Sequence, residues 1–467
     1  MAQDGIGGVS AVVSEWVGRL AYEDLPDDVV TASKYRILDV LGLSIAGGQT
    51  PFGRSVHAAA QALYPGRASR VWGASSTASV VGAAFTNGAL SQALEYDDTH
   101  NESIVHMSSP SVAAALALAD QHKFNGREVI KAVAIGNEIS SRVGSITPGQ
   151  FHKRGFHPSG LFAPFGVCWL TASLYKLEQE QMICAAGVVG SFAAGLLQCW
   201  VDGTQSKFLH PGWAAHSGIA AATLAQANAT GPAAVFEGRF GLFASHLQSD
   251  EIAPNYARLT EGLGEEWESR NASFKPFPVA HVIHPYIDAL LRLRAEHKLT
   301  PVNVKRIVCP VAPYIVGIVC EPVSEKRRPN TDSHGRVSLQ YTLAEALALG
   351  RIGKDAYAPQ SLKDPDILGL ADRVEFVVDE SLPGPQQFKG VVKIELANGR
   401  WVESVEEHNR GSRANPMSPE DLQAKFRENV SDVIAGKRAE RLADAVLDLE
   451  TACDASVLTL MTTPANA

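Results

Sequence analysis

The densest group of residues able to do acid–base chemistry lies at positions 95–106, between two strongly apolar segments. These twelve positions contain four carboxylates and two histidines: Glu95, Asp97, Asp98, Glu102, His100 and His106. A plain turn is the alternative, because Asp, Thr and Asn often cap helices and close turns. A cap needs only one such side chain, however, and polar residues gathered in a connection on a rigid scaffold commonly form a site. The pattern favours proton transfer by carboxylate and imidazole groups.

A second polar cluster, at residues 151–160, directly precedes an apolar helix predicted over residues 161–175. An anion bound there would meet the cations Lys153 and Arg154, and also the free N–H groups and positive dipole end of the helix. This combination suits a carboxylate substrate. For His157 in the same cluster, a structural histidine that only makes a hydrogen bond is the alternative.

Two lysines stand at the edges of apolar stretches. Residues 208–236 contain no Asp, Glu, Lys or Arg, so Lys207 borders a long uncharged segment. Lys275 begins a Lys-Pro-Phe-Pro run that leads to His281 and His284. A lysine held among apolar groups can anchor an anion or act as an acid or base, whereas an ordinary surface lysine is the alternative. The two histidines could suggest a metal site, but prolines break the helix that such spacing normally requires.

The sequence lacks the motifs of nucleotide binding, of serine hydrolases and of cysteine-bound metal sites. The chain has no GxGxxG or GxxxxGK[ST] phosphate loop and no GxSxG nucleophile elbow. Its six cysteines lie far apart without a CxxC pair, which disfavours a zinc or iron–sulfur site and predicts reduced, mostly buried thiols. The net charge is -9 and the Lys and Arg residues are scattered, which argues against nucleic acid as a partner. The N-terminus does not have the pattern of a signal peptide, so a cytoplasmic protein is expected.

Helices are predicted to position these residues in the first half of the chain. Apolar residues recur there at helical spacing, with Gly, Pro or Ser-Pro between the segments, for example at 29–42, 111–122 and 127–143. Residues 182–201 carry no charge and imitate a membrane span. Their glycines and alanines nevertheless predict one close-packed, buried helix, so no membrane partner is expected.

The composition changes at residues 273–285, where a second domain is predicted to begin with a helix at 288–297. The β-branched runs that predict strands are 304–311, 374–378 and 390–396, and Asn398-Gly399 is a hairpin signal. A polar helical pattern returns at 419–446 and is expected to pack on the first half. The predicted fold is mostly α with an inserted α+β domain. Its predicted boundaries are an all-helical domain of residues 1–270 and 405–467 and an α+β domain of residues 271–404.

Seven short motifs follow one another along the chain. They are Lys34-Tyr35-Arg36-Ile37-Leu38-Asp39; Glu95-Tyr96-Asp97-Asp98-Thr99-His100 with His106; Gly155-Phe156-His157-Pro158; Lys207 with Gly212-Trp213-Ala214-Ala215; Lys275-Pro276-Phe277-Pro278; His284-Pro285 with Asp288-Ala289; and Ser338-Leu339-Gln340-Tyr341. In this order, and over most of the chain, they resemble the MmgE/PrpD family. That family includes 2-methylcitrate dehydratase, cis-aconitate decarboxylase and iminodisuccinate epimerase.

The resemblance implies a two-domain architecture in which the α+β domain is a lid on the helical domain, and it implies a homodimer. It also implies catalysis without metal, iron–sulfur cluster or nucleotide, so no cofactor is expected. The site residues that it implies are Asp97, His106, His157, Lys207 and His281 for catalysis, and Thr99 and Lys275 for substrate binding. His216 stands where the family's arginine is expected. If that arginine binds a carboxylate, the substrate of this chain would carry one anionic group fewer. The spacing from His100 to His106 looks like that of the decarboxylases.

The predicted chemistry is removal of a proton from a carbon next to a carboxylate in a small di- or tricarboxylate. His106 or His157 would take the proton while Asp97 orients one of them. Lys207 and Lys275 would stabilise the negative charge that develops.

Dehydration, decarboxylation and epimerisation share this proton abstraction and differ in the later fate of the carbanion-like intermediate. The first prediction is a hydro-lyase like 2-methylcitrate dehydratase, in which His281 gives a proton to the leaving hydroxyl. An epimerase (an isomerase) or a decarboxylase of a related di- or tricarboxylate is the alternative. Two remote alternatives are a magnesium-dependent helical enzyme of prenyl diphosphates, which would use Asp97, Asp98 and Glu102, and a catalytically inactive family member.

Overall fold

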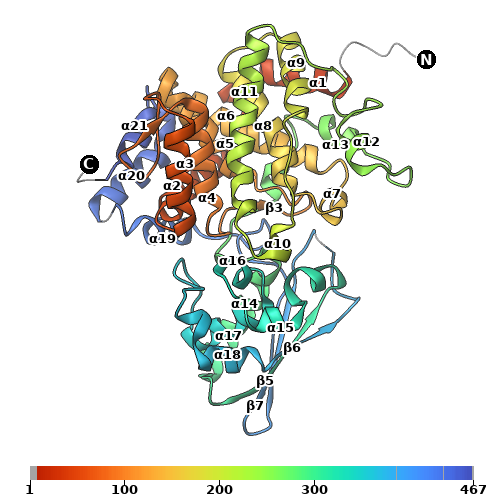
Figure 1. Cartoon of the computed structure of the whole chain (residues 1–467), viewed down its shortest axis with the longest axis vertical. Coiled ribbons are helices and arrows are strands. Elements are labelled where there is room, and N and C mark those ends of the chain that lie inside the picture. The colour runs from red at the N-terminus through yellow and green to blue at the C-terminus, as the bar shows by residue number, and fades with distance from the viewer. Residues whose placement is uncertain (1–7, 385, 435, 465–467) are drawn as a thin grey trace.

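The computed structural model describes residues 8–384, 386–434 and 436–464. Two large hydrophobic cores organise this part of the chain. Residues 13–272 and 426–458 build the first core, and residues 277–396 build the second. Figure 1 shows the first as a body of helices and the second, around a small sheet, below it. The predicted fold class, mostly α with an α+β part in a two-domain architecture, is confirmed.

The helical body contains long helices from both ends of the chain. They are α1 (Gly8–Arg19), α2 (Asp27–Gly48), α3 (Pro51–Leu63), α4 (Val80–Gln92), α5 (Ser108–His122), α6 (Gly126–Gly144), α8 (Pro158–Leu174), α9 (Gln179–Gly190), α11 (His210–Gln226), α19 (Pro419–Val430) and α20 (Lys437–Leu447). The shorter ones are α7 (Gln150–Lys153), α10 (Cys199–Asp202), α12 (Leu242–Leu247), α13 (Ala257–Thr260) and α21 (Ser456–Met461), and β1 (Ser69–Arg70) pairs with β2 (Thr77–Ala78). The helices predicted at 29–42, 111–122 and 127–143 lie within α2, α5 and α6. The pattern at 419–446 forms two helices, α19 and α20, rather than one.

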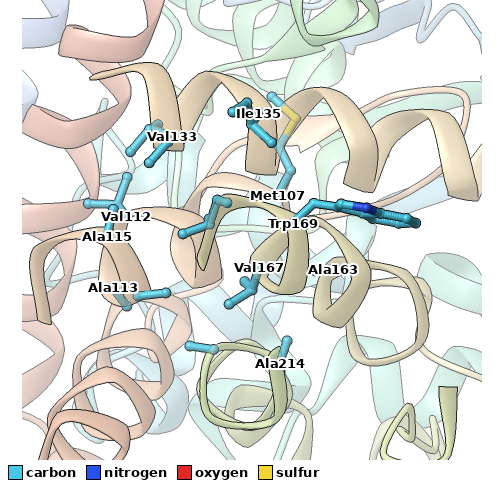
Figure 2. Packing of buried hydrophobic residues seen from close by; sticks show 14 of the residues in the cluster. Met107, Val112, Ala113, Ala115, Val133, Ile135, Ala163, Val167, Trp169 and Ala214 are labelled. Carbon is cyan, nitrogen blue, oxygen red and sulfur yellow. The ribbon is translucent and has the colours of Figure 1, made fainter. Parts of the chain in front are cut away.

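Small residues let the central helices of this body approach one another closely. Figure 2 shows side chains of α5, α6, α8 and α11 interlocking, with Val167 of α8 facing Ala214 of α11. In α11, a Cβ added at Gly212 would lie 2.2 Å from the carbonyl oxygen of Phe85 in α4. A 3₁₀ turn, Ser206–Leu209, runs directly into α11 and carries Lys207. The tight α4–α11 contact therefore fixes where this lysine lies.

The second part contains a four-stranded sheet in the order β6-β5-β7-β8. Its strands are β5 (Val304–Val311), β6 (Val374–Val378), β7 (Gly390–Leu396) and β8 (Trp401–Glu406), and its helices are α14 (His284–His297), α15 (Val323–Arg327), α16 (Asp332–Gly335), α17 (Leu339–Leu349) and α18 (Pro365–Ala371). β5 runs parallel to β6 and antiparallel to β7. The three predicted strands are confirmed. Gly399, with a φ of +83°, closes the predicted hairpin between β7 and β8.

The single helix predicted at 182–201 is wrong in its second half. α9 ends at Gly190, and the chain turns before α10 begins at Cys199. The intervening backbone pairs with the loop ahead of α8: the amide of Leu197 donates to Gly155 O, and Gly195 O accepts from the amide of His157. These tertiary hydrogen bonds satisfy the groups that a continued helix would have paired. No helix in the described ranges has the length and apolarity needed to cross a membrane.

Candidate active site

A short two-stranded ribbon brings the polar connection at 95–106 to the boundary between the two cores. β3 (Thr99–His100) pairs antiparallel with β4 (Ala272–Ser273), with Thr99 opposite Ser273. Lys275 follows this ribbon after one intervening residue, so it is held beside the connection. Its Nζ donates to the backbone carbonyl of Glu95 at 3.0 Å.

One cavity collects most of the predicted site residues. The predicted residues that line it are Thr99, His106, His157, Lys207, Lys275 and His281. Further lining comes from Glu95, His152, Lys153, Trp200, Tyr314 and Phe388, among others. Both parts of the chain contribute, and all of the predicted residues are buried. Asp97 is the exception to the lining, because it is fully buried behind His106 and does not reach the cavity.

A buried carboxylate lies between the two predicted lysines. Glu95 Oε2 is 2.6 Å from Lys207 Nζ, and Glu95 Oε1 is 3.4 Å from Lys275 Nζ. Burial alone would raise the pKa of the Glu95 carboxyl, but the ammonium groups of Lys207 and Lys275 outweigh burial and hold that pKa well below its ordinary value. Glu95 also has a φ of 54°, which L-residues seldom adopt. The site therefore presents two closely spaced cations that one internal carboxylate partly neutralises.

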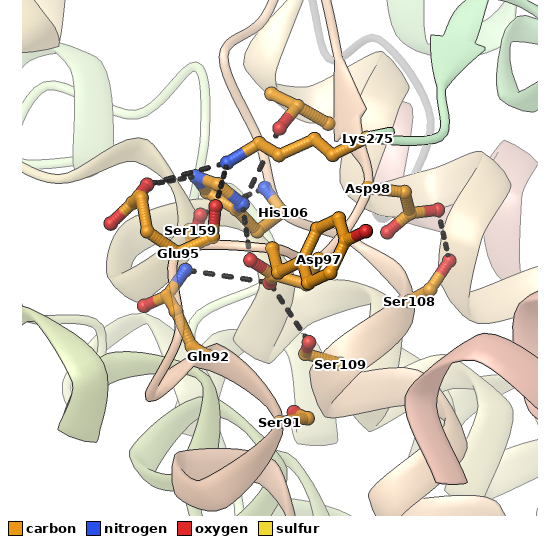
Figure 3. Close-up of polar contacts among 12 residues, drawn as sticks. Ser91, Gln92, Glu95, Asp97, Asp98, His106, Ser108, Ser109, Ser159 and Lys275 are labelled. Atoms are coloured by element: carbon orange, nitrogen blue, oxygen red, sulfur yellow. Dashed lines mark hydrogen bonds and ion pairs between the residues drawn. The ribbon is translucent and has the colours of Figure 1, made fainter. Parts of the chain in front are cut away.

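His106 is held between a carboxylate and the cavity. Its Nδ1 lies 3.1 Å from Asp97 Oδ1, while Ser109 Oγ donates to the other Asp97 oxygen at 2.8 Å. Figure 3 shows His106 between Asp97 and Glu95, whose Oε1 is 4.0 Å from His106 Nε2. Burial would raise the pKa of Asp97, yet the adjacent His106 lowers it. An ionised Asp97 beside Nδ1 fixes the ring orientation and leaves Nε2 on the side of Glu95, which lines the cavity.

Two further imidazoles on the same side of the cavity are kept neutral. His157 occupies the N-cap position of α8 without a side-chain capping hydrogen bond, and burial, with His210 and Lys207 nearby, lowers its pKa well below 6.5. Burial and the charge of Lys207 lower the pKa of His152 to about 4. Neutral imidazoles can accept a proton from carbon or donate a hydrogen bond, but they add no positive charge to the resting site.

His281 approaches from the other part of the chain, on a 3₁₀ turn ahead of α14. The amide nitrogen of Asn409 contacts its Nε2 at 2.9 Å, and Nδ1 is buried without a hydrogen-bond partner among the described residues. Burial, with His284 and Lys275 nearby, lowers the pKa of His281 well below its ordinary value. A neutral ring whose Nε2 accepts from Asn409 carries its proton on Nδ1.

The acidic cluster does not form a shared metal site. Asp98 forms an ion pair with Arg36 and accepts from Ser108 Oγ at 2.6 Å, while Glu102 lies 2.5 Å from a nitrogen of Arg258. Asp97 faces His106 instead. Each carboxylate of the alternative magnesium set thus has its own cationic or imidazole partner, which argues against the prenyl-diphosphate hypothesis. In the ranges that the structure describes, no group of three or more His, Cys, Asp or Glu is placed to hold a metal ion.

Some residues of the site were not predicted. Glu95 was visible in the acidic cluster, but only its contact with two lysines distant in sequence distinguishes it from Glu102. Trp200 and Tyr314 have no local signal, because the fold alone carries them to the cavity. From His216, in the place of the family's arginine, a substrate with one anionic group fewer was expected. His216 is not among the lining residues, however, and it stacks on Trp213 with 5.0 Å between the ring centroids. Its identity therefore gives no information on how many carboxylates the substrate carries.

Comparison with known proteins agrees with this architecture. Models of the MmgE/PrpD N-terminal domain and the MmgE/PrpD C-terminal domain match residues 12–255 and 277–451. The chain is 27% identical to the cis-aconitate decarboxylase-like protein oryM of Aspergillus oryzae, over 97% of this chain and 96% of that relative. It is 28% identical to the cis-aconitate decarboxylase of Aspergillus terreus, over 97% of this chain and 95% of the relative, and 28% identical to that of Homo sapiens, over 94% and 91%. The chain belongs to the MmgE/PrpD family.

Proposed function

We propose that this chain is a lyase that moves a proton at a carbon next to a carboxylate of a small di- or tricarboxylate. One observation carries the proposal: two buried ammonium groups, Lys207 and Lys275, face the same cavity as three imidazoles from different parts of the chain, His106, His157 and His281. In a cavity shielded from water, fixed cations stabilise the enolate-like charge that forms at such a carbon when it loses a proton or when CO2 leaves. Imidazole is the side chain best suited to carry that proton near neutral pH.

The geometry supports His106 as the principal proton carrier. Asp97 at 3.1 Å stabilises the protonated ring, so His106 can take a proton from carbon and also return one. Lys275 and Lys207 both contact Glu95, and either can contact a substrate carboxylate once the substrate displaces or joins Glu95. Thr99 Oγ1, 3.4 Å from His106 Nδ1, borders the same space.

Decarboxylation is the reaction that we rank first. The relatives named as cis-aconitate decarboxylases support this ranking over the dehydration that the sequence first predicted. In an unsaturated tricarboxylate of that kind, the C–C bond to one carboxylate breaks and CO2 leaves. The bond's electron pair forms a new C=C, and the former double bond takes up a proton at its far carbon. One proton is consumed per turnover, and a protonated His106 beside Asp97 is placed to give it.

Dehydration is the second candidate, and one observation favours it. The Nδ1 of His281 has no partner among the described residues, and His281 lines the cavity from the side of the second core. The His281 imidazole could give a proton to a leaving hydroxyl while His106 removes the proton from carbon, as 2-methylcitrate dehydration would require.

Product analysis of the purified chain tests the proposal. We would incubate it with cis-aconitate, 2-methylcitrate, citrate and an aminodicarboxylate, with and without EDTA, and follow products by NMR and released CO2. We expect turnover of at least one of these acids, with CO2 from cis-aconitate if decarboxylation is the reaction and an unsaturated acid without CO2 if dehydration is. Turnover is expected to survive EDTA. A correctly folded protein that leaves the whole panel unchanged would overturn the proposal.

A further inference from the structure

A histidine outside the cavity contacts one of the histidines that line it. His210, the first residue of α11, has its Nδ1 2.8 Å from Nδ1 of His157. His157 is buried, whereas His210 is partly exposed. At this distance one of the two nitrogens must donate and the other must accept, so a single proton lies between the rings.

The surroundings keep both rings neutral. Burial, together with the charge of Lys207, lowers the pKa of His210 to about 4. Burial also lowers the pKa of His157, and the charged or titratable groups that face it are His210, Lys207, His106 and His152. Two neutral imidazoles carry one N–H each, which leaves two ways to arrange their protons.

The two arrangements give His157 opposite roles. When His157 Nδ1 donates to His210, its Nε2 is unprotonated and can take a proton. When His210 Nδ1 donates to His157, the Nε2 of His157 carries hydrogen and can give a proton. A backbone carbonyl in the place of His210 could only accept and would lock His157 as a base. An imidazole partner permits both states.

We propose that His210 is a positioning residue that sets the tautomer of His157 and relays its proton to solvent. A proton taken at His157 Nε2 is balanced by transfer of the Nδ1 proton to His210 Nδ1 and by loss of the Nε2 proton of His210 to water. The reverse sequence recharges His157. This inference rests on the proposed function, because the relay requires a substrate carbon that gives a proton to His157 or takes one from it.

Two substitutions separate a relay from simple packing. His210→Asn keeps a hydrogen-bonding group near the Nδ1 position but cannot pass a proton through, and His210→Phe keeps a ring without nitrogen. The matched control is His216→Asn, in the same helix, because His216 does not line the cavity. We expect both His210 variants to lower kcat by about 10²-fold, with KM within about 3-fold of wild type and an altered pH profile, and the control to stay near wild type. Wild-type kcat and pH profile in His210→Asn would overturn the relay.

A second measurement does not depend on activity. Ring-nitrogen chemical shifts of isotope-labelled histidine, assigned with His157→Gln, are expected to show His157 and His210 neutral and sharing one proton between about pH 6 and 8. In His210→Phe the shifts of His157 are expected to move to those of a different tautomer mixture. If the substrate panel gives no turnover but these shifts appear, the proposed function fails and the histidine pair stands. Independent titration of the two rings near an ordinary pKa would overturn the pair itself.

Discussion

Glu95 is the residue on which the electrostatics of the site depend most. Its carboxylate faces the ammonium groups of Lys207 and Lys275, and all three side chains are buried. Removing one member of a buried charge set leaves the others uncompensated, at a cost of about 3–5 kcal/mol. Glu95→Gln is therefore expected to lower the free energy of unfolding by about 3 kcal/mol at pH 7, as measured by urea denaturation.

The same contact predicts a pH dependence with a definite sign. Because the folded-state pKa of Glu95 lies well below its ordinary value of 4.5, the unfolded chain binds more protons around and below that pH. The stability that ionised Glu95 contributes is fully present above about pH 5 and is lost as the pH falls. The difference in unfolding free energy between wild type and Glu95→Gln is expected to shrink as the pH is lowered toward about 3.5. A difference that stays constant over this range would contradict the assigned charge state.

Under the proposed function, Asp97 would act on the reaction through His106 rather than by touching substrate. Asp97→Asn replaces the carboxylate beside His106 with a neutral amide. This change is expected to lower kcat by roughly 10²- to 10⁴-fold with little change in KM. Steady-state kinetics on an acid that the wild-type protein turns over would measure this split. Ser109→Ala, which removes only the contact to the other Asp97 oxygen, serves as the milder comparison. A loss in Asp97→Asn that appears in KM with kcat unchanged would contradict the orienting role.

We expect burial to decide which of the lysines that line the cavity matter for substrate binding. Lys275→Met removes a cation that is 1% exposed and is expected to lower kcat/KM by about 10²-fold or more. Lys153 also lines the cavity but is exposed, so Lys153→Gln is expected to change kcat/KM by less than about 3-fold, and less still at high salt. Comparable losses in both variants would mean that the anion is bound at the rim of the cavity.

Residue types and spacing predicted much of this site but not its connections. The motifs around Lys207, His157 and Lys275 indicated residues that do line one cavity, because each stands out from apolar surroundings in the sequence. The pairing of Glu95 with two lysines could not be predicted, since it depends on how the ribbon at β3 and β4 and the α4–α11 contact place segments that are far apart along the chain.

At the scale of elements, the strands of the sheet were the most predictable. β5, β6 and β7 have the predicted bounds because β-branched runs are bounded there by Gly, Pro or Asn. The helix predicted over 182–201 failed because composition says nothing about tertiary partners. Its second half pairs instead with the loop that carries His157, and that loop belongs to the site.

The α4–α11 contact gives a prediction at the same scale. Gly212→Ala would push a Cβ against the Phe85 carbonyl and shift the start of α11, so it is expected to destabilise the protein by about 1–3 kcal/mol and to lower activity through Lys207. Gly369→Ala in α18 is the control, because nothing lies within 4 Å of the added carbon, and it is expected to be neutral or slightly stabilising. Thermal unfolding of both variants, with activity assays, would test this. Loss of stability in the control alone would contradict the packing argument.

At the scale of the whole molecule, the cavity exists only where the two cores meet. Arg336, ahead of α17, donates to the carbonyls of Leu94 and Pro278 at 2.9 and 2.7 Å, and so ties the second part to the segment that carries Glu95. The sequence indicated this organisation through the change in composition near residue 273 and the return of a helical pattern after residue 415. In the structure that pattern returns to the first body, where Lys425 of α19 forms a 2.7 Å ion pair with Asp39 of α2.

Solvent deuterium incorporation is the most direct test of proton transfer by this site. Wild-type protein would be incubated with cis-aconitate and the other acids in D2O and the carbon-bound deuterium located by NMR, with a His106→Gln variant as the control. With the wild-type protein we expect deuterium at a carbon next to a carboxylate in the product or in recovered substrate. In the variant, the rate of deuterium incorporation is expected to fall by about 10²-fold or more. Decarboxylation of cis-aconitate without any carbon-bound deuterium, or unchanged incorporation in the variant, would contradict proton transfer by His106 in this cavity.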